Sequence, residues 1–398
     1  MHRNGYPLAT STWGSEEYDA VDSVLKSGDF TMGKKVSEFE NEFARYIGTD
    51  FALMVNSGSS ANLVLIAALK YQKNSNFQPG DEIIVPSVSW STTYYPIQQL
   101  GFKLKFVDIN SETFNIDIDK LKGAVSPKTK AVFAVNLLGN SCDFKKLNDF
   151  CSENDLTLIE DNCESLGAEY AGQKTGSFGL AGTHSFFFSH HICTMEGGMV
   201  TTSSRELYET MISLRAHGWL RGLPKINSVA NLSENEWENQ FKFVLPGYNL
   251  RPLEIEAAAG LSQLHKFPKF LEMRIQNANY FKSKFANAED FRIQSEIGNS
   301  SWFGFAIVLQ GRLVGQRESL LTILSKAGIE TRPIVSGNFL ENPVMEHLPH
   351  VIHGDINVAH EIHVNGFFLG NSHLDLRNEI DLFHEVFRDY ISGLVEKI

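Results

Sequence analysis

The sequence predicts an α/β protein whose large domain is built on a mostly parallel β-sheet and is followed by a smaller α/β domain. The first observation is that short apolar runs alternate with helical stretches from residue 51 onward, which is typical of βαβ units and of a sheet buried on both faces. The second is the length of 398 residues, which favours two domains. The third is a composition of 42% hydrophobic and 21% charged residues, typical of a soluble globular protein.

Two helices are predicted ahead of the sheet. Residues 15–26 carry apolar side chains at helical spacing and acidic residues in the first turn, and residues 36–47 repeat this pattern after a turn at residues 30–33. The strands predicted for the large domain are residues 51–55, 82–85, 104–109, 131–135, 156–161, 183–188 and 198–202. The helices predicted among them and after the last strand are residues 60–69, 92–100, 144–154 and 206–217.

The domain boundary is predicted near residue 250, although no flexible linker marks it. A Pro-Gly turn there leads into an alanine-rich helix, which continues as a long polar-faced helix at residues 266–285. Residues 1–250 would form the large domain, including the N-terminal helices, and residues 251–398 the small one. The elements predicted in the small domain are a strand at residues 302–309, a helix at 317–327 and a closing helix at 379–398.

The charge of the chain argues against two classes of partner. A net charge of −12 and a pI near 5.6 repel nucleic acid and anionic membrane surfaces, so we expect neither as the main partner. The N-terminal residues lack the apolar segment of a signal peptide, and no apolar run approaches the length of a membrane span. We therefore expect a cytoplasmic protein.

The cysteines argue against a structural metal site. The four cysteines are scattered, without a CxxC pair, at Cys142, Cys151, Cys163 and Cys193. We expect reduced, mostly buried thiols and no zinc or iron–sulfur ligation.

Two motifs follow predicted strands of the large domain. Residues 56–62 read NSGSSAN at the start of a helix, where backbone N–H groups and the helix dipole suit a phosphate; a simple helix N-cap is the alternative. Trp90 lies just past the strand at 82–85, at the carboxyl edge of the sheet where ligands bind in open α/β folds. Its indole could stack on a flat heteroaromatic ring, with a core tryptophan as the alternative.

Asp161 ends an apolar strand in the motif IEDNCESLGA. A carboxylate in such a place is unfavourable unless a positive group pairs with it. A protonated pyridine nitrogen would be a suitable partner, and the pairing would keep the ring an electron sink. The alternative is that Asp161 caps the following turn.

Two adjacent histidines, His190 and His191, lie in the segment SFFFSHHICTMEGGMV of residues 185–200. An imidazole can accept and return a proton near neutral pH, so His190 is a candidate for both base and acid in one catalytic cycle. No metal-binding spacing such as HExxH surrounds the pair. We derive no role for His191, for which a satisfied surface or core residue is the alternative.

In this order, the motifs resemble the sugar-aminotransferase family of the aspartate aminotransferase fold, whose members act on nucleotide-linked keto-sugars with pyridoxal 5'-phosphate (PLP). The similarity runs from about residue 8 to the end and includes SGSSAN, DEIIVPSVSWSTT, IEDNCESLGA, SFFFSHHICTMEGG, RAHGW and PGYNLRP. It implies the type I fold of PLP-dependent enzymes, with a mixed, mostly parallel seven-stranded sheet in the large domain. His190 stands where family members carry the lysine that binds the cofactor covalently.

The resemblance also implies the other residues of the site. The residues that it places at the cofactor are Ser57, Gly58, Ser59, Trp90, Asp161, Glu164, Ser185 and, from the second subunit of a homodimer, Asn249. The serines, Gly58 and Asn249 would hold the phosphate. Glu164 would lie near the ring hydroxyl, where the family usually has glutamine; a carboxylate there must share or hold a proton.

Three further residues are weaker candidates for the substrate side. His217, in RAHGW, is expected to face the same pocket, although its role does not follow from its type. Glu330 and Arg332, in GIETRPI, are candidates for the nucleotide, because an arginine can pair with a diphosphate. A surface strand end is the alternative for the last two.

Histidine at the lysine position implies a dehydratase. In the branch that the sequence resembles most, GDP-linked 4-keto-6-deoxy-D-mannose loses its C3 hydroxyl, L-glutamate donates the amino group, and the cofactor alternates non-covalently bound between PLP and pyridoxamine 5'-phosphate. The other branch with histidine here needs a cluster held by four cysteines that this sequence cannot match. The alternatives are a nucleotide-sugar aminotransferase and a non-catalytic subunit that binds cofactor or nucleotide-sugar.

Overall fold

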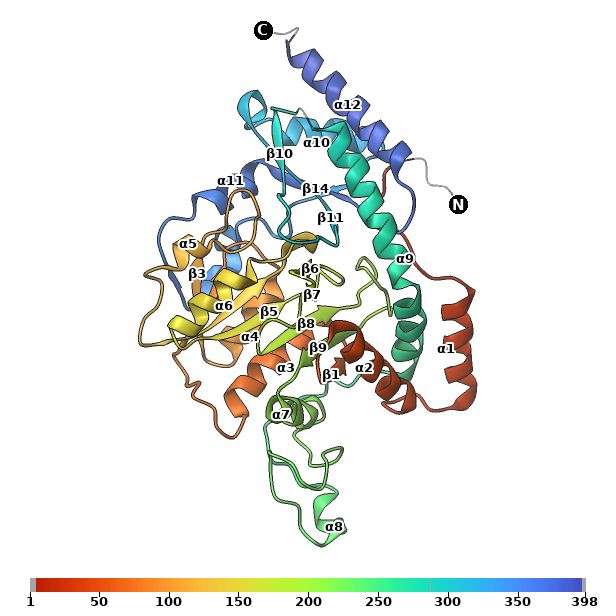
Figure 1. Ribbon diagram of the computed structural model, residues 1–398, viewed down its shortest axis with the longest axis vertical. Coiled ribbons are helices and arrows are strands. Elements are labelled where there is room, and N and C mark those ends of the chain that lie inside the picture. The colour runs from red at the N-terminus through yellow and green to blue at the C-terminus, as the bar shows by residue number, and fades with distance from the viewer. Residues whose placement is uncertain (1–4, 287, 396–398) are drawn as a thin grey trace.

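The large sheet has eight strands in the order β1-β9-β8-β5-β4-β2-β3-β13. The computed structural model describes residues 5–286 and 288–395, and Figure 1 shows this sheet at the centre of the molecule. The strands of the large sheet are β1 (Phe51–Val55), β2 (Glu82–Pro86), β3 (Lys103–Val107), β4 (Thr129–Val135), β5 (Thr157–Asp161), β8 (Ala181–Ser185), β9 (Gly198–Thr202) and β13 (His350–Ile352).

The large sheet is mixed and mostly parallel, as predicted. Strands β8, β5, β4, β2, β3 and β13 pair in parallel, whereas β9 pairs antiparallel with both β8 and β1. All seven predicted strands form, but the sheet gains an eighth, β13, from the C-terminal part of the chain. The sequence did not reveal β13 because its three residues are all exposed and form no apolar run.

One predicted strand, residues 183–188, is too long. Strand β8 ends at Ser185 because the chain then turns: the His190 amide donates to the Phe187 carbonyl at 2.9 Å. Phe186 is fully buried, whereas Phe187 and Phe188 are 44% and 46% exposed. The aromatic run therefore belongs to the loop that carries the paired histidines.

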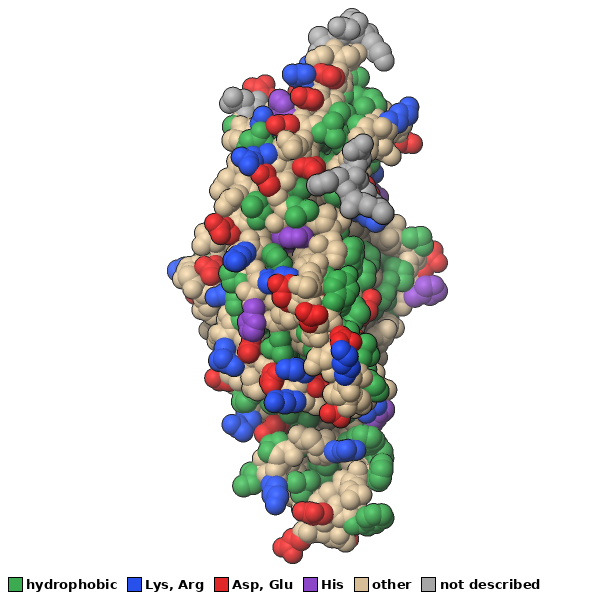
Figure 2. Space-filling model, turned by 90° about the vertical axis from the view of Figure 1, so that its right-hand side faces the viewer, with side chains coloured by type: hydrophobic (Ala, Val, Ile, Leu, Met, Phe, Trp, Pro, Cys, Tyr) green, Lys and Arg blue, Asp and Glu red, His purple; other side chains and the backbone are tan. Residues whose placement is uncertain are grey.

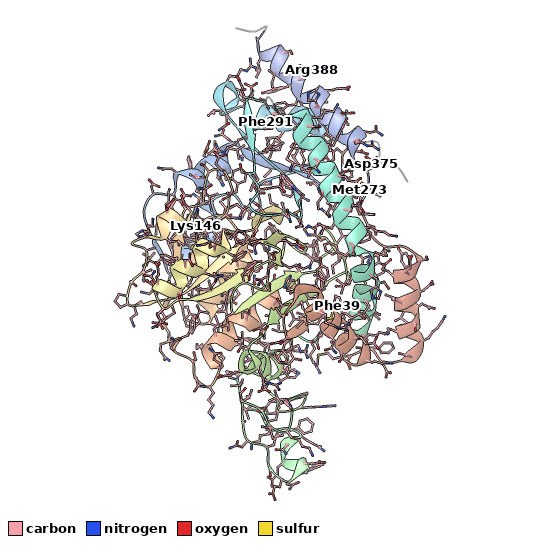
Figure 3. All side chains as sticks on the ribbon, in the orientation of Figure 1. Phe39, Lys146, Met273, Phe291, Asp375 and Arg388 are labelled. Atoms are coloured by element: carbon pink, nitrogen blue, oxygen red, sulfur yellow. The ribbon has the colours of Figure 1, made fainter. Side chains whose placement is uncertain are left out.

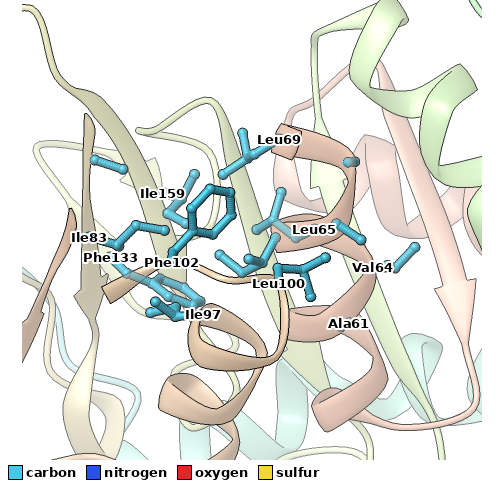
Figure 4. Packing of buried hydrophobic residues seen from close by; sticks show 14 of the residues in the cluster. Ala61, Val64, Leu65, Leu69, Ile83, Ile97, Leu100, Phe102, Phe133 and Ile159 are labelled. Atoms are coloured by element: carbon cyan, nitrogen blue, oxygen red, sulfur yellow. The ribbon is translucent and has the colours of Figure 1, made fainter. Parts of the chain in front are cut away.

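Helices cover both faces of the large sheet, which is why its strands are apolar on both sides. The helices of one face are α3 (Gly58–Tyr71), α4 (Ser91–Gln99) and α7 (Arg205–Arg215). The helices of the other face are α2 (Lys34–Ile47), α5 (Ile118–Leu121), α6 (Phe144–Glu153) and α9 (Glu254–Lys284). Figure 4 shows Leu65 and Leu69 of α3 packed with Phe133 and Ile159 of the sheet.

Helix α9 is one continuous element of 31 residues that runs along the side of the molecule (Figure 1). Helix α1 (Ser15–Ser27) packs on it through Glu17, which binds Lys266 at 2.7 Å. Helix α2 approaches so closely that a Cβ on Gly260 would lie 2.6 Å from the Phe39 ring. Figure 3 shows Phe39 beside the lower part of α9 and Met273 farther up, next to the start of the last helix.

The C-terminal part contains an antiparallel sheet in the order β10-β11-β14-β12. Its strands are β10 (Phe291–Ile293), β11 (Gly304–Leu309), β12 (Thr331–Arg332) and β14 (Gly366–Gly370), and its helices are α10 (Arg317–Lys326), α11 (Asn357–Asn365) and α12 (Arg377–Val395). The predicted helices at 317–327 and 379–398 correspond to α10 and α12, except that residues 396–398 lie outside the described residues.

The division at residue 250 stays a prediction. The N-terminal segment packs with the small sheet, because Tyr6 is fully buried there and donates to the Gly370 carbonyl at 2.8 Å. In the other direction, β13 belongs to the large sheet. The two parts of the chain therefore exchange segments across the predicted boundary.

An extended arm, residues 217–250, projects from the large domain and carries the short helix α8 (Glu236–Asn239) at its tip (Figure 1). Several of its apolar side chains are exposed, including Ile226 at 92% and Trp237 at 77%. Figure 2 shows hydrophobic side chains on this lower end of the molecule.

Two further short strands, β6 (Glu169–Tyr170) and β7 (Gln173–Lys174), form a hairpin. None of the described helices is long and apolar enough to cross a membrane.

Candidate active site

A cavity of about 710 Å³ lies at the carboxyl edge of the large sheet, and the small domain forms its opposite wall. It receives residues that follow β2, β4, β5 and β8, together with the first turn of α3, as expected for an open α/β sheet. The predicted site residues that line it are Ser57, Gly58, Ser59, Trp90, Asp161, Glu164, Ser185, His190 and Arg332. Motifs that are far apart in the sequence therefore meet at one place.

The first turn of α3 is built for an anion. Ser57 is its N-cap, and the Ser57 hydroxyl oxygen accepts from the Ser60 amide at 3.0 Å. Gly58 follows against the end of β8, where a Cβ would lie only 2.6 Å from the Ser185 Cβ. The serines Ser57, Ser59 and Ser185 thus line the cavity together with the first turn of a 14-residue helix, whose first amides suit an anion. The N-cap and the anion site are both compatible with this geometry.

Asp161 ends β5 and is only 5% exposed. Its carboxylate accepts from Asn62 Nδ2 at 3.0 Å, Thr93 Oγ1 at 2.7 Å and the Cys163 amide at 3.2 Å. No ion pair to Asp161 occurs among the described residues. These neutral donors hold the carboxylate in place, and its negative charge is available to a cation in the cavity.

Asn62 and Thr93 are functional residues that the sequence reasoning missed. Each lies in the first turns of a helix that begins beside the cavity, α3 and α4 respectively. Their polar side chains are almost fully buried, at 2% and 0% exposure. A buried polar residue near the start of a helix that already carries a candidate motif is the signal that could have identified them.

Glu164 lies beside Asp161 in the cavity wall and accepts from the Leu138 amide at 3.1 Å. Burial raises the pKa of Glu164 to about 7, the Leu138 hydrogen bond opposes this rise, and the negative charge of Asp161 adds to it. The carboxyl group is therefore able to hold a proton near neutral pH.

The paired histidines differ in their surroundings. The His190 ring lines the cavity and packs edge-on against Phe303, with ring centroids 5.3 Å apart. His190 Nδ1 is buried and has no hydrogen-bond partner among the described residues. His191 is 1% exposed, and its Nε2 lies 3.1 Å from the Ser301 carbonyl oxygen. His190 therefore faces the cavity and His191 faces the protein interior.

Burial lowers the pKa of His190 to about 4, and the nearby charge of Arg274 lowers it further in the same direction. Both causes also hold the pKa of His191 well below its usual range. His190 is consequently a neutral imidazole at pH 7 and is able to accept a proton.

Trp90 and Arg332 also line the cavity. Trp90 precedes α4 and is 58% exposed, so its indole is available to a flat ligand. Arg332 comes from β12 of the small sheet and is exposed, and its guanidinium forms no ion pair or hydrogen bond with another described residue. It is the part of the small domain that offers a positive charge to the cavity.

Three predicted residues do not line this cavity. Asn249 is exposed on the arm and accepts from Arg251 Nε at 2.9 Å. His217, with a φ of 62°, packs its ring against Trp219 at 4.8 Å. Glu330 accepts from the Leu8 amide at 3.0 Å and so fastens the N-terminal segment. Within one chain, none of them reaches the residues described above.

The residues present fit a phosphorylated pyridine such as PLP. The tightly packed Gly58 turn suits a phosphate, the buried Asp161 suits a protonated ring nitrogen, and the exposed indole of Trp90 suits the ring face. Among the described residues, no three His, Cys, Asp or Glu side chains gather as ligands for a metal ion. The four thiols are free, and three of them are buried.

Comparison with known proteins identifies a family and several relatives of the chain. The model of the DegT/DnrJ/EryC1/StrS aminotransferase family matches residues 12–380. GDP-4-keto-6-deoxy-D-mannose 3-dehydratase of Escherichia coli O55:H7 is 49% identical over 385 residues, which are 96% of this chain and 99% of that protein. The enzyme of the same name from Yersinia pseudotuberculosis is 50% identical over 94% of this chain and 96% of its own length. A crystal structure of GDP-4-keto-6-deoxymannose-3-dehydratase with a trapped PLP-glutamate geminal diamine is 49% identical, with a TM-score of 0.94, and the match covers 96% of this chain and 100% of that one.

Proposed function

The chain belongs to the DegT/DnrJ/EryC1/StrS aminotransferase family, and from this membership we propose that it is a PLP- and glutamate-dependent GDP-sugar 3-dehydratase. Its substrate is GDP-4-keto-6-deoxy-D-mannose, and its product is the corresponding 3,6-dideoxy sugar. One observation carries this proposal: a neutral imidazole, His190, faces the cavity where a family member has its lysine. An imidazole moves protons but forms no lasting link to an aldehyde.

The cofactor-binding residues are proposed as follows. The first turn of α3, with Ser57, Ser59 and the Ser185 hydroxyl, holds the phosphate, because helix N-termini and hydroxyls donate to phosphate oxygens. Asp161 binds the protonated ring nitrogen, and Asn62 and Thr93 fix the direction of its carboxylate. When bound, the cofactor carries the amino group taken from L-glutamate and serves as an electron sink for the adjoining sugar.

The chain's own proton transfers centre on His190. The neutral imidazole first accepts a proton, and the imidazolium then donates it to the oxygen of the C3 hydroxyl, which leaves as water. Glu164 holds its proton at the ring hydroxyl side of the cavity, because its pKa of about 7 keeps much of it protonated at neutral pH. The Asp161 carboxylate, held by Asn62 and Thr93, is directed at the ring nitrogen. The two carboxyl groups thus have different roles in one cavity.

The absence of a lysine side chain at position 190 determines the fate of the nitrogen. Histidine cannot recapture the amino group through a covalent link, so the unsaturated amine leaves and is hydrolysed in water. The overall change converts one sugar and one L-glutamate into one deoxygenated sugar, one 2-oxoglutarate and one ammonia. An aminotransferase would keep the nitrogen on the sugar instead.

A homodimer with shared active sites is the arrangement that we propose. The exposed apolar side chains of the arm favour contact with a second copy, and Asn249, on the same segment, lies outside the cavity of its own chain. Mixing two inactive variants, His190→Asn and Asn249→Ala, tests this: each mixed dimer contains one complete site, so activity returns. If the mixture stays inactive although subunits exchange, Asn249 does not serve the neighbouring site.

The four free cysteines further support a reducing, cytoplasmic environment for the enzyme. The proposed substrate side includes Arg332, whose free guanidinium can bind the diphosphate. Replacing it with Ala should raise the KM for the sugar nucleotide with little change in kcat. His217 and Glu330 remain predictions for the same side.

Product analysis tests the proposed function. The purified protein with PLP and L-glutamate should release 2-oxoglutarate, and addition of GDP-4-keto-6-deoxy-D-mannose should give a sugar lighter by one oxygen atom together with free ammonia. A product that retains nitrogen would favour an aminotransferase. A protein that binds PLP but releases no 2-oxoglutarate would contradict the glutamate-dependent half of the cycle.

A further inference from the structure

Arg274 is a buried cation in the middle of α9, and its side chain has no described carboxylate as a partner. It is 4% exposed, and its Nη1 donates to the carbonyl oxygens of Trp302, Phe303 and Asn371, at 3.3, 3.3 and 3.0 Å. An arginine held only by carbonyl oxygens in the interior is unfavourable for stability unless other factors compensate. Its contacts indicate what it does instead.

The residues that Arg274 holds form the wall behind the paired histidines. The Phe303 ring lies 5.3 Å from the His190 ring and 5.6 Å from the His191 ring, measured between centroids. The carbonyl of Ser301, the residue before Trp302, is the partner of His191 Nε2. Ser301 and Phe303, on either side of Trp302, therefore contact the histidines, and Arg274 binds the carbonyl oxygens of Trp302 and Phe303.

The wall has a strained backbone that needs such support. Trp302 has a φ of 47°, in the left-handed region that residues other than glycine rarely adopt. It docks on a second turn, where Leu138 has a φ of 50° and a Cβ on Gly139 would lie 2.5 Å from the Trp302 amide nitrogen. The Phe303 amide donates to the Leu138 carbonyl at 3.0 Å. The Arg274 hydrogen bonds to the Trp302 and Phe303 carbonyl oxygens add a second set of contacts to this segment.

We propose that Arg274 is a positioning residue for His190: by holding the carbonyl oxygens of Trp302 and Phe303, it sets the Phe303 ring against the imidazole and fixes the direction of that imidazole in the cavity. This inference rests on the proposed role of His190 as the proton carrier. Arg274 is not among the residues that line the cavity, so it acts through this wall and through its charge.

The charge of Arg274 supports the same role. It acts from α9 on His190, and together with burial it favours the neutral form that a base needs. The other titratable groups around His190 are its neighbour His191 and, in the lining of the cavity, Asp161, Cys163, Glu164, Glu196 and Arg332. Replacing the guanidinium with an apolar side chain should therefore loosen the ring and also raise its pKa.

The test compares Arg274→Met and Arg274→Lys with the control Arg292→Met. Arg292 lies in the small sheet and binds Glu361 and the Ser111 carbonyl, away from the cavity. Cofactor-free protein labelled with 15N-histidine is titrated by NMR, with the His190 signals assigned from their loss in His190→Asn. We expect Arg274→Met to raise the His190 titration midpoint by roughly one pH unit. In the loaded enzyme it should lower kcat about 100-fold with little change in KM.

The lysine variant keeps the positive charge but lacks the planar guanidinium with its several N–H donors. The titration midpoint of His190 should therefore return toward the wild-type value, while kcat recovers only in part. The inference is overturned if Arg274→Met matches Arg292→Met in both the midpoint and kcat. If Arg274→Met does not fold, Phe303→Leu decides: it leaves Arg274 in place but removes the ring contact, and an unchanged kcat overturns the positioning role. A failure of the proposed function can be distinguished from a failure of this inference, because the His190 titration midpoint is measured without cofactor or sugar.

Discussion

Replacing Glu164 with Gln should change how the stability of the cofactor-free protein depends on pH. The pKa of Glu164 is raised from its ordinary 4.5 to about 7 by burial and by Asp161. The folded protein therefore keeps a proton on Glu164 that the unfolded chain releases. The contribution of this group to the free energy of unfolding is fully present below pH 4.5 and is lost as the pH rises through 7. Glutamine has no proton to lose and is able to accept the same bond from Leu138.

The expected magnitude follows from the size of the displacement. Each pH unit corresponds to about 1.4 kcal/mol, so the carboxylate form destabilises the folded protein by about 3 kcal/mol at high pH. Urea unfolding of wild type and Glu164→Gln should then give free energies of unfolding that are similar near pH 4.5 and diverge up to pH 8, with the variant more stable. The difference should level off once the pH has passed 7.

A matched control is Glu385→Gln, which changes an exposed carboxylate on α12. It should show no such divergence. Parallel stability curves for wild type and Glu164→Gln across this range would refute the reasoning, because they would mean that Glu164 releases its proton equally in the folded and unfolded chains.

Three other variants test the cavity. His190→Asn should retain cofactor absorbance but lose dehydration by at least about 100-fold, because the proton carrier is gone; rapid turnover would assign that role to another group. His190→Lys should form a covalent link to PLP that borohydride traps, seen as a mass increase on the peptide containing residue 190; if no adduct forms, position 190 does not face the cofactor. Asp161→Asn removes the charge but keeps the shape, so PLP affinity should fall roughly tenfold or more while its donors Asn62 and Thr93 stay in place; unchanged affinity by absorbance titration would show that no ring cation binds there.

The sequence was informative where one motif follows one strand. The cavity edges of β1, β2, β5 and β8 each carry a motif that was recognised in advance, because a polar or small residue directly after an apolar strand has a defined place at the carboxyl edge of a parallel sheet. The asymmetry between His190 and His191 was also foreseen. Its cause was not, because it depends on a wall formed by residues more than a hundred positions away.

The parts that could not be predicted depend on contacts between distant segments. Nothing in the local pattern around Phe303 or Arg274 indicates that they meet the histidine loop. Glu330 was selected as a polar residue near an arginine, but its carboxylate binds the backbone of Leu8. Side-chain type therefore indicated which residues at strand ends line the cavity, but it failed for Glu330, whose partner comes from the distant N-terminal segment.

The short strand β13 has a consequence for how the protein is made. It covers the outer edge of β3, pairing Val351 with Lys105, and it is translated only when most of the chain has already emerged. Until then β3 presents a row of unpaired backbone groups, the type of edge on which other chains add in aggregation. A fragment that ends at residue 250 keeps this open edge permanently. The large sheet is thus completed by a strand from the last quarter of the chain. We expect the yield of folded protein in cells to fall as the time during which the β3 edge stays unpaired increases.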